Sequence, residues 1–251
     1  MPRRPSGRPK IEEATRYVGL FDILGFSSRV ENNDLGKVVE FFRDFQALIE
    51  SKKTLLDGIS LGGRARRPLG YKLFSDTMLV YTTDSSFDSL HTLLLFSMVL
   101  LREGLLTGIG LRGAIAKGEV AVGDNLFVGV PIVLAYRLEQ QQEWLGCWVD
   151  DTCLEGLSGA EMWRLEGDMI IPYRIPLKSG TVRSLWAINW TVKIHLSNQQ
   201  ELASEKLDEI FSMTNKALPW DVKRKRDNTR QFYEYCMANV RELLGDKLIL
   251  K

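Results

Sequence analysis

The chain has 251 residues, of which 45% are hydrophobic and 26% are charged, ordinary proportions for a globular protein with a substantial core. Its 33 lysines and arginines balance 32 aspartates and glutamates, so there is no net field to attract a nucleic acid or an anionic membrane. The longest apolar run, Leu93 to Leu101, is far shorter than the roughly 20 residues of a membrane span. Three cysteines and two histidines are too few for a disulfide framework or a zinc site, so we expect a cytoplasmic protein with no membrane or nucleic-acid partner.

The N-terminal part of the chain predicts a strand covered by a helix. Residues 1–14 begin with interspersed prolines and basic side chains and predict a flexible basic tail. An apolar run from Tyr17 to Phe26 predicts a buried strand that ends in a turn, and Asp22 interrupts it. Asp34 can cap the next helix, whose apolar residues recur every three or four positions as far as Ile49. Residues 52–69 are rich in Gly, Lys and Arg and predict a loop.

Two hairpins and a second helix are predicted next. Residues 71–74 and 78–81 flank Ser75, Asp76 and Thr77 and predict a hairpin with an acid at its tip. Residues 86–104 predict an apolar helix, and residues 109–116 and 119–122 predict another hairpin around Lys117 and Gly118. This order favours an α+β fold, a ferredoxin-like antiparallel sheet flanked by helices.

The remainder of the chain is predicted to be mainly helical. Pro131 favours a helix start, and Arg137 lies about two turns into that helix. Strands are predicted at 170–175 and 184–190, and helices at 199–217 and 221–244. We expect one main domain over residues 15–195, with residues 196–251 as its helical C-terminal extension. The basic run at 223–226 is most simply a solvated helix face.

Two acids are the main candidates for chemistry. Asp22 and Asp76 each end a strand within apolar sequence, where a buried carboxylate is costly unless it is paired or binds a metal ion. With few histidines present, hard oxygen ligands favour Mg²⁺ or Mn²⁺. If the two strands are neighbours, both acids reach one site, as two-metal phosphoryl chemistry requires. The alternative is that each aspartate only caps a turn. Arg137 is either a solvated helix residue or a group that stabilises charge on a transferring phosphoryl group.

Four segments in order resemble the class III nucleotide cyclases. Residues 21–26 (FDILGF) resemble the first metal motif of that family, and residues 72–76 (KLFSD) resemble the second. Residues 112–118 (RGAIAKG) are similar to the strand and glycine before the dimerisation segment. Residues 129–138 (GVPIVLAYRL) resemble the helix that carries the transition-state arginine, here Arg137. The DILGF and SDT segments most resemble the pyrimidine cyclases of the bacterial Pycsar antiphage systems.

The resemblance implies a mechanism and an assembly. Asp22 and Asp76, with the carbonyl oxygen of Ile23, would carry two divalent ions, Mg²⁺ or Mn²⁺, while the ribose 3′-hydroxyl attacks the α-phosphorus and pyrophosphate leaves. Arg137 would come from the partner subunit, so a homodimer with two equivalent sites is implied. Phe26, in the turn whose backbone amides can wrap phosphate oxygens, is a substrate-binding candidate. Lys178 would be the late triphosphate-binding lysine, or else a solvated hairpin residue.

The substrate base is expected to be read by Lys72. A lysine only donates hydrogen bonds, which suits acceptors on uracil, cytosine or adenine and disfavours guanine. Tyr71 points to the other face of a regular strand and would join the pocket only through a bulge. Val133 stands where the family usually has an asparagine that contacts the ribose, which argues against a purine cyclase.

The expected function is conversion of UTP to 3′,5′-cyclic UMP as a second messenger in antiphage defence, acting on a separate effector. Synthesis of cyclic CMP from CTP is the close alternative. An adenylate cyclase and a catalytically silent cyclase-like module for dimerisation or nucleotide sensing also stay open.

Overall fold

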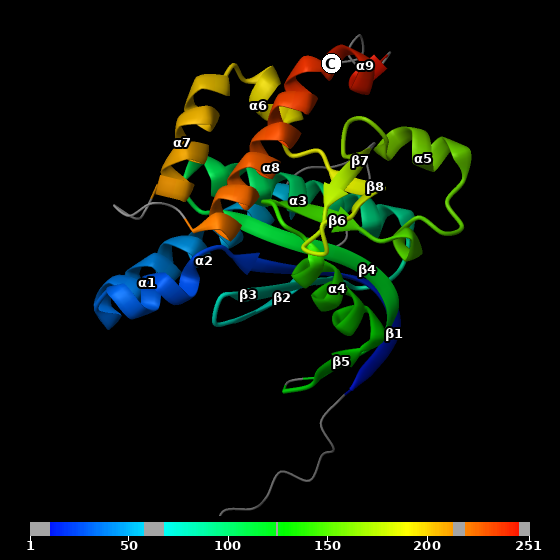
Figure 1. The fold of residues 1–251 in the computed structure, drawn as a ribbon. Coiled ribbons are helices and arrows are strands. Elements are labelled where there is room, and N and C mark those ends of the chain that lie inside the picture. Colours follow the sequence, from blue (N-terminus) through cyan, green and yellow to red (C-terminus); the bar gives the residue numbers. More distant parts are fainter. Residues whose placement is uncertain (1–10, 58–67, 124, 213–218, 246–251) are drawn as a thin grey trace, which may run out of the picture.

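The computed structural model describes residues 11–57, 68–123, 125–212 and 219–245. Within these residues, eight strands form one sheet in the order β2-β3-β1-β4-β6-β8-β7, and β5 pairs with the outer part of β4 (Figure 1). The β4–β6 pair is parallel and the other pairs are antiparallel. The strands are β1 (Glu12–Ile23), β2 (Leu69–Phe74), β3 (Thr77–Thr82), β4 (Leu111–Val122), β5 (Phe127–Gly129), β6 (Gly146–Val149), β7 (Ile170–Pro176) and β8 (Val182–Ile188).

The N-terminal half confirms the predicted ferredoxin-like arrangement. Strands β2, β3, β1 and β4 lie side by side and antiparallel, and helices follow both β1 and β3 in the chain. Helices α1 (Phe26–Asn32) and α2 (Leu35–Asp57) follow β1, and α3 (Phe87–Leu106) follows β3. Helix α4 (Val130–Gln141) packs on β4 and β1 from the opposite face to α3 (Figure 1). The sheet is therefore covered on both faces beside the end of β1.

The predicted helix starts are confirmed at atomic detail. The Asp34 carboxylate accepts a hydrogen bond from the backbone N–H of Lys37 at 3.0 Å, which satisfies one of the free donors at the start of α2. Ser86 caps α3 in the same way, by accepting from the N–H of Ser89 at 3.3 Å. Helix α3 is long and apolar enough to cross a membrane, yet 67% of its most apolar window is buried inside the fold. It is the core helix that the apolar run predicted.

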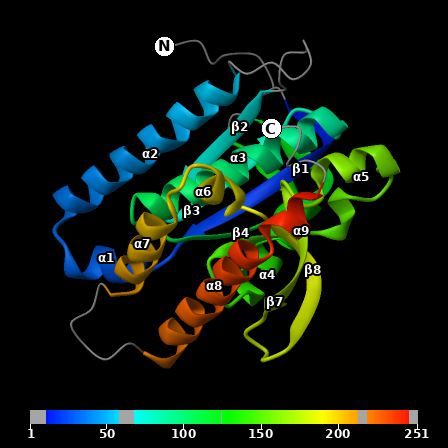
Figure 2. The same ribbon diagram turned by 90° about the horizontal axis from the view of Figure 1, so that it is seen from above.

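The C-terminal helices share a core with the sheet. They are α5 (Gly159–Leu165), α6 (Val192–Leu196), α7 (Gln200–Ser212), α8 (Trp220–Ala238) and α9 (Val240–Leu244). Figure 2 shows α7 and α8 lying across the same side of the sheet as α3. Phe232 of α8 packs edge-on against Trp144 and against Tyr173 of β7, with ring centroids 4.7 Å apart in both pairs. Because Trp144 and Phe232 are fully buried, α8 is part of the folded core.

The predicted hairpin around Lys117 and Gly118 is wrong. Strand β4 runs without a break from Leu111 to Val122 and pairs with β1 along its whole length, with Gly118 opposite Arg16. The physical reason is that β1 starts at Glu12, inside the segment predicted to be a tail, and so offers β4 a full-length partner. The chain instead turns back after β4 to form β5.

Other boundaries also differ from the prediction. Residues 52–57 continue helix α2, whereas 58–67 lie outside the described residues. The helix predicted at 221–244 is interrupted at Asn239, whose side-chain amide caps the carbonyl of Tyr235 at 2.7 Å. Helix α7 is described to Ser212, so the predicted stretch at 213–217 is untested. Strand β6 and helix α5 carry no clear periodicity and were not predicted.

Candidate active site at the end of β1

The two candidate metal-binding acids lie at the same corner of the sheet. Asp22 is next to last in β1 and stands opposite Thr77 of β3 and Arg112 of β4. Asp76 lies in the β2–β3 turn, where its backbone carbonyl accepts the N–H of Ile23 at 3.1 Å. Neighbouring strands therefore bring the two acids together, as the prediction required.

The charge of Asp22 is unfavourable in the protein alone. The pKa of Asp22 is raised from 3.8 to about 7, first by burial and then by the nearby carboxylates of Glu139 and Asp76, although Arg112 and Lys178 lower it. The Asp22 side chain nevertheless remains 22% exposed, so it is open to a ligand. A divalent cation would remove this penalty because it offers the carboxylate an opposite charge.

The donors at this corner fit a hard cation. Among the described residues, no three His, Cys, Asp or Glu side chains gather around one point. Mg²⁺ is commonly bound by one or two carboxylates together with substrate phosphates and water, so Asp22 and Asp76 suffice for such a site. This donor set also fits Mn²⁺, and it does not fit zinc.

The buried ion pair of Arg112 and Glu139, which the sequence analysis missed, lies next to Asp22. Arg112 donates to Asp22 at 3.4 Å, to the carbonyl of Gln142 at 3.1 Å and to the Glu139 carboxylate. Arg112 is 6% exposed and Glu139 is 1% exposed. Because Glu139 neutralises most of the guanidinium charge, Arg112 orients Asp22 without cancelling its need for a cation. The sequence did contain a signal for this residue. A charged arginine within the apolar start of β4 is costly unless it is paired, which is the argument that singled out Asp22.

Arg137 faces away from its own chain. Helix α4 buries Pro131, Ala135, Leu138 and Glu139 against the sheet, which leaves Arg137 on the solvent side. Its guanidinium has no ion pair or hydrogen bond to any residue that the structure describes. Val133, one turn earlier, is 50% exposed on the same face. Arg137 is therefore on the exposed face of α4, where it can reach another molecule.

The base-reading candidates separate onto the two faces of β2. Pairing through Leu79 and Leu20 puts Lys72 on the same face as Asp22, and its ammonium donates to the carbonyl of Gly123 at 3.3 Å. Tyr71 lies on the opposite face and donates to Glu50 of α2 at 2.5 Å. No bulge turns Tyr71 into the pocket, so it is not part of this site.

The other two substrate-binding candidates are placed differently. The Phe26 ring is buried against Phe42 in an edge-on contact of 5.2 Å, so only its backbone can face a ligand. Lys178 is exposed in the β7–β8 turn, and its backbone N–H donates to the carbonyl of Gln141 at 2.8 Å. Partial desolvation of its ammonium, together with Arg112 and Lys225, lowers the pKa of Lys178, although Glu139 and Glu143 raise it.

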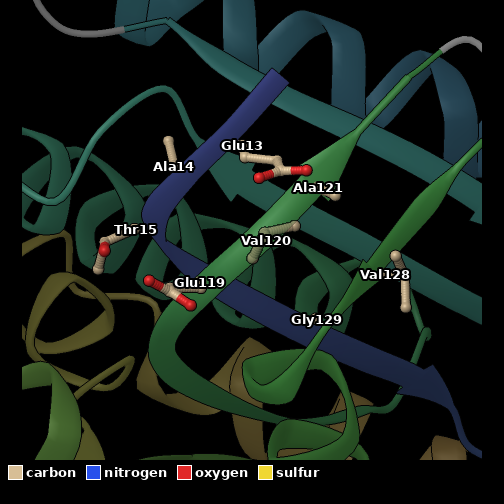
Figure 3. Close-up of a pocket in the computed structure, with 8 residues that line it drawn as sticks. All are labelled: Glu13, Ala14, Thr15, Glu119, Val120, Ala121, Val128 and Gly129. Carbon is tan, nitrogen blue, oxygen red and sulfur yellow. The ribbon is translucent and has the colours of Figure 1, made fainter. Parts of the chain in front are cut away.

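A hollow of about 480 Å³ lies at the other end of β1, where β5 folds back on β4 (Figure 3). Glu13 and Glu119 line it together with Val128 and Gly129. A side chain at Gly129 would meet the carbonyl of Glu119 at 2.3 Å, so only glycine allows this close approach. The two acids disfavour a phosphate ligand, and neither Asp22 nor Asp76 lines the hollow.

The comparisons with known proteins bear on the fold. No protein-family model matches the chain, and no curated protein matches its sequence. The guanylyl cyclase domain of the RhoGC fusion protein from Blastocladiella emersonii is similar at 15% identity with a TM-score of 0.52, covering 72% of this chain and 97% of that one. The guanylate cyclase domain of RhGC from Catenaria anguillulae, solved with GTP, has 14% identity and a TM-score of 0.49 over 70% and 97%. Adenylyl cyclase CyaB from P. aeruginosa has 13% identity and a TM-score of 0.48 over 71% and 95%. The chain thus has the α+β fold of a class III cyclase catalytic domain, with helices at its C-terminal end.

Proposed function

We propose that this protein is a pyrimidine nucleotide cyclase that converts UTP to 3′,5′-cyclic UMP and pyrophosphate. The observation that carries the proposal is the meeting of Asp22 and Asp76 at one corner of a cyclase-like sheet, together with Arg137 on an exposed helix face, where none of the described residues pairs with it. The fold supports a nucleotide cyclase in general, and the choice of UTP goes beyond it.

Each of the candidate residues has a distinct role in the proposed reaction. Asp22 and Asp76, with the Ile23 carbonyl, hold the cations, and bound Mg²⁺ or Mn²⁺ supplies activation of the 3′-hydroxyl and neutralisation of the triphosphate. The 3′-oxygen forms a bond to the α-phosphorus, the bond to the β-phosphate oxygen breaks, and the hydroxyl proton passes to solvent. Arg137 from the partner subunit stabilises the charge that develops on the α-phosphate oxygens.

If the aspartates come from one subunit and Arg137 from the other, the enzyme must be a homodimer. The exposed surface around Arg137 is consistent with such a dimer. Arg137 lies on the exposed face of α4, which suits a role in the site of a second copy of the chain. Around it, apolar side chains are exposed on α4 and β5: Val128 (55%), Val130 (72%), Val133 (50%) and Tyr136 (54%). Exposed apolar groups gathered on neighbouring elements are typical of a protein interface. A second copy of the chain would cover them and complete two sites.

Lys72 favours a substrate base with hydrogen-bond acceptors, such as uracil O4 or cytosine N3, because its ammonium can only donate. Valine at position 133 removes the amide that purine cyclases use for the ribose. CTP is the alternative substrate, since the two pyrimidines differ at one exocyclic group. In antiphage defence, the cyclic product would act as a second messenger, so no stable contact with its effector is needed.

The test is incubation of the purified protein with Mn²⁺ and each of the four ribonucleoside triphosphates, with products identified by mass. We expect cyclic UMP from UTP, and loss of all product in Asp22→Ala and Asp76→Ala. Asp44→Ala, which removes an exposed acid on α2, is the matched control and keeps its activity. Cyclic AMP as the sole product would make the protein an adenylate cyclase, and no product from any nucleotide would favour a silent dimerisation or sensing module.

A further inference from the structure

The basic run at the start of α8 is not a free solvated face. The side-chain amide of Asn228 donates to the carbonyl of Glu143 at 2.7 Å, and the Thr229 hydroxyl accepts the N–H of Leu145 at 2.8 Å. Arg224 forms an ion pair with the Glu143 carboxylate, which is 6% exposed. The N-terminal half of α8 is therefore fixed to the segment that joins α4 to β6.

The same segment belongs to the corner that holds Asp22. Arg112, which contacts Asp22, also donates to the carbonyl of Gln142 at 3.1 Å. On the other side, the backbone N–H of Lys178 donates to the carbonyl of Gln141 at 2.8 Å. Residues 141–145 thus connect the start of α8, the β7–β8 turn and the Asp22 corner.

The buried carboxylates around this segment already have cationic partners. Glu139 is occupied by Arg112, and Glu143 is occupied by Arg224. The ammonium of Lys178 forms no ion pair with the described residues. Partial burial and repulsion from Arg112 and Lys225 lower its pKa, although Glu139 and Glu143 oppose them. Arg112, Lys178 and Lys225 thus repel one another, and an anionic ligand would stabilise the cluster.

Lys225 is the unusual member of this cluster. Its side chain is only 15% exposed although it lies on a helix at the surface. Its nearest carboxylate is Asp221, one turn earlier at 3.6 Å, and that carboxylate is 63% exposed, so the pair is weak. A lysine that is mostly buried, weakly paired and close to a second lysine is suited to hold a phosphate group as a compact point charge.

We propose that Lys225 of α8, together with Lys178, binds the polyphosphate of the nucleotide, so that the C-terminal helix forms part of the substrate site. This inference rests on the proposed function, in which the ligand is a nucleoside triphosphate and the product is pyrophosphate. It gives α8 a direct role in binding the substrate, in addition to its place in the core.

Kinetics of Lys225→Gln test the proposal. Loss of one charged contact to phosphate raises KM for UTP about tenfold. The contact exists before and during the reaction, so kcat stays within about twofold. Lys225→Arg restores most of the affinity because it keeps the positive charge. Lys223→Gln is the matched control, since Lys223 is exposed on the same helix, and it leaves KM unchanged.

Calorimetric titration with inorganic tripolyphosphate in the presence of Mn²⁺ separates this proposal from the proposed function. Tripolyphosphate binding needs no turnover, so it decides the issue even if no cyclic nucleotide is made. We expect about tenfold weaker binding to Lys225→Gln than to the wild type and to Lys223→Gln, with unchanged thermal midpoints. Equal binding by all three proteins, or none by the wild type, overturns the role of Lys225.

Discussion

Replacing Asp22 with asparagine should stabilise the protein in the absence of metal while abolishing any turnover. The pKa of Asp22 rises from 3.8 to about 7 on folding, mainly because of burial. Since the folded pKa is the higher one, the native state binds the proton more tightly than the unfolded chain does. This contribution to stability is complete below pH 3.8 and is lost as the pH rises through 7.

The size of the effect follows from the shift. Each pKa unit corresponds to about 1.4 kcal/mol, so the ionised carboxylate costs at most about 4 kcal/mol above pH 7. The side chain is 22% exposed, and partial contact with water reduces this to about 2 kcal/mol. Asparagine has nearly the same shape and no charge, and Arg112 keeps its pairing with Glu139. The variant should therefore be about 2 kcal/mol more stable at pH 8.

Urea unfolding of both proteins between pH 5 and pH 8, in a buffer with a chelator, measures this difference. The advantage of Asp22→Asn should grow with pH, and added Mn²⁺ should reverse it by stabilising the wild type alone. This prediction is refuted if the stability difference is the same at every pH, or if the variant is less stable than the wild type at pH 8. Either result would show that the ionised Asp22 carboxylate does not destabilise the metal-free protein.

Three other substitutions test the rest of the site. Glu139→Ala leaves Arg112 as an uncompensated buried charge, and urea unfolding should show a loss of about 3–5 kcal/mol; a loss below about 1 kcal/mol would refute the buried pair. Tyr71→Phe removes only a hydrogen bond on the far face of β2, so KM and kcat for UTP should stay within about twofold; a large rise in KM would return Tyr71 to the pocket. Mixing Asp76→Ala and Arg137→Ala proteins should recover about a quarter of wild-type activity, because half the dimers are mixed and each carries one intact site. No recovery after subunit exchange would mean that the sites are not shared.

The sequence alone determined the elements that have a strong local pattern. The apolar strand around Asp22, the capped helix after Asp34 and the apolar helix from Phe87 were predicted with their types correct, because each buries a continuous face that periodicity reveals. The acids at positions 22 and 76 could be singled out because a charge within an apolar strand is costly. The order of the predicted strands and helices along the chain then sufficed to predict the ferredoxin-like sheet.

Only the tertiary structure decided which groups meet across the sheet. Strand register set Arg112 beside Asp22, and helix packing then added Glu139, so the charge balance of the corner could not be read from spacing. The uninterrupted length of β4 depended on a partner strand that begins nearly one hundred residues earlier in the chain. Tyr71 and Lys72 are adjacent in sequence, yet the alternation of side chains along a regular strand assigns them to opposite faces. The attachment of α8 to residues 143–145 likewise depends on long-range hydrogen bonds, which no local pattern encodes.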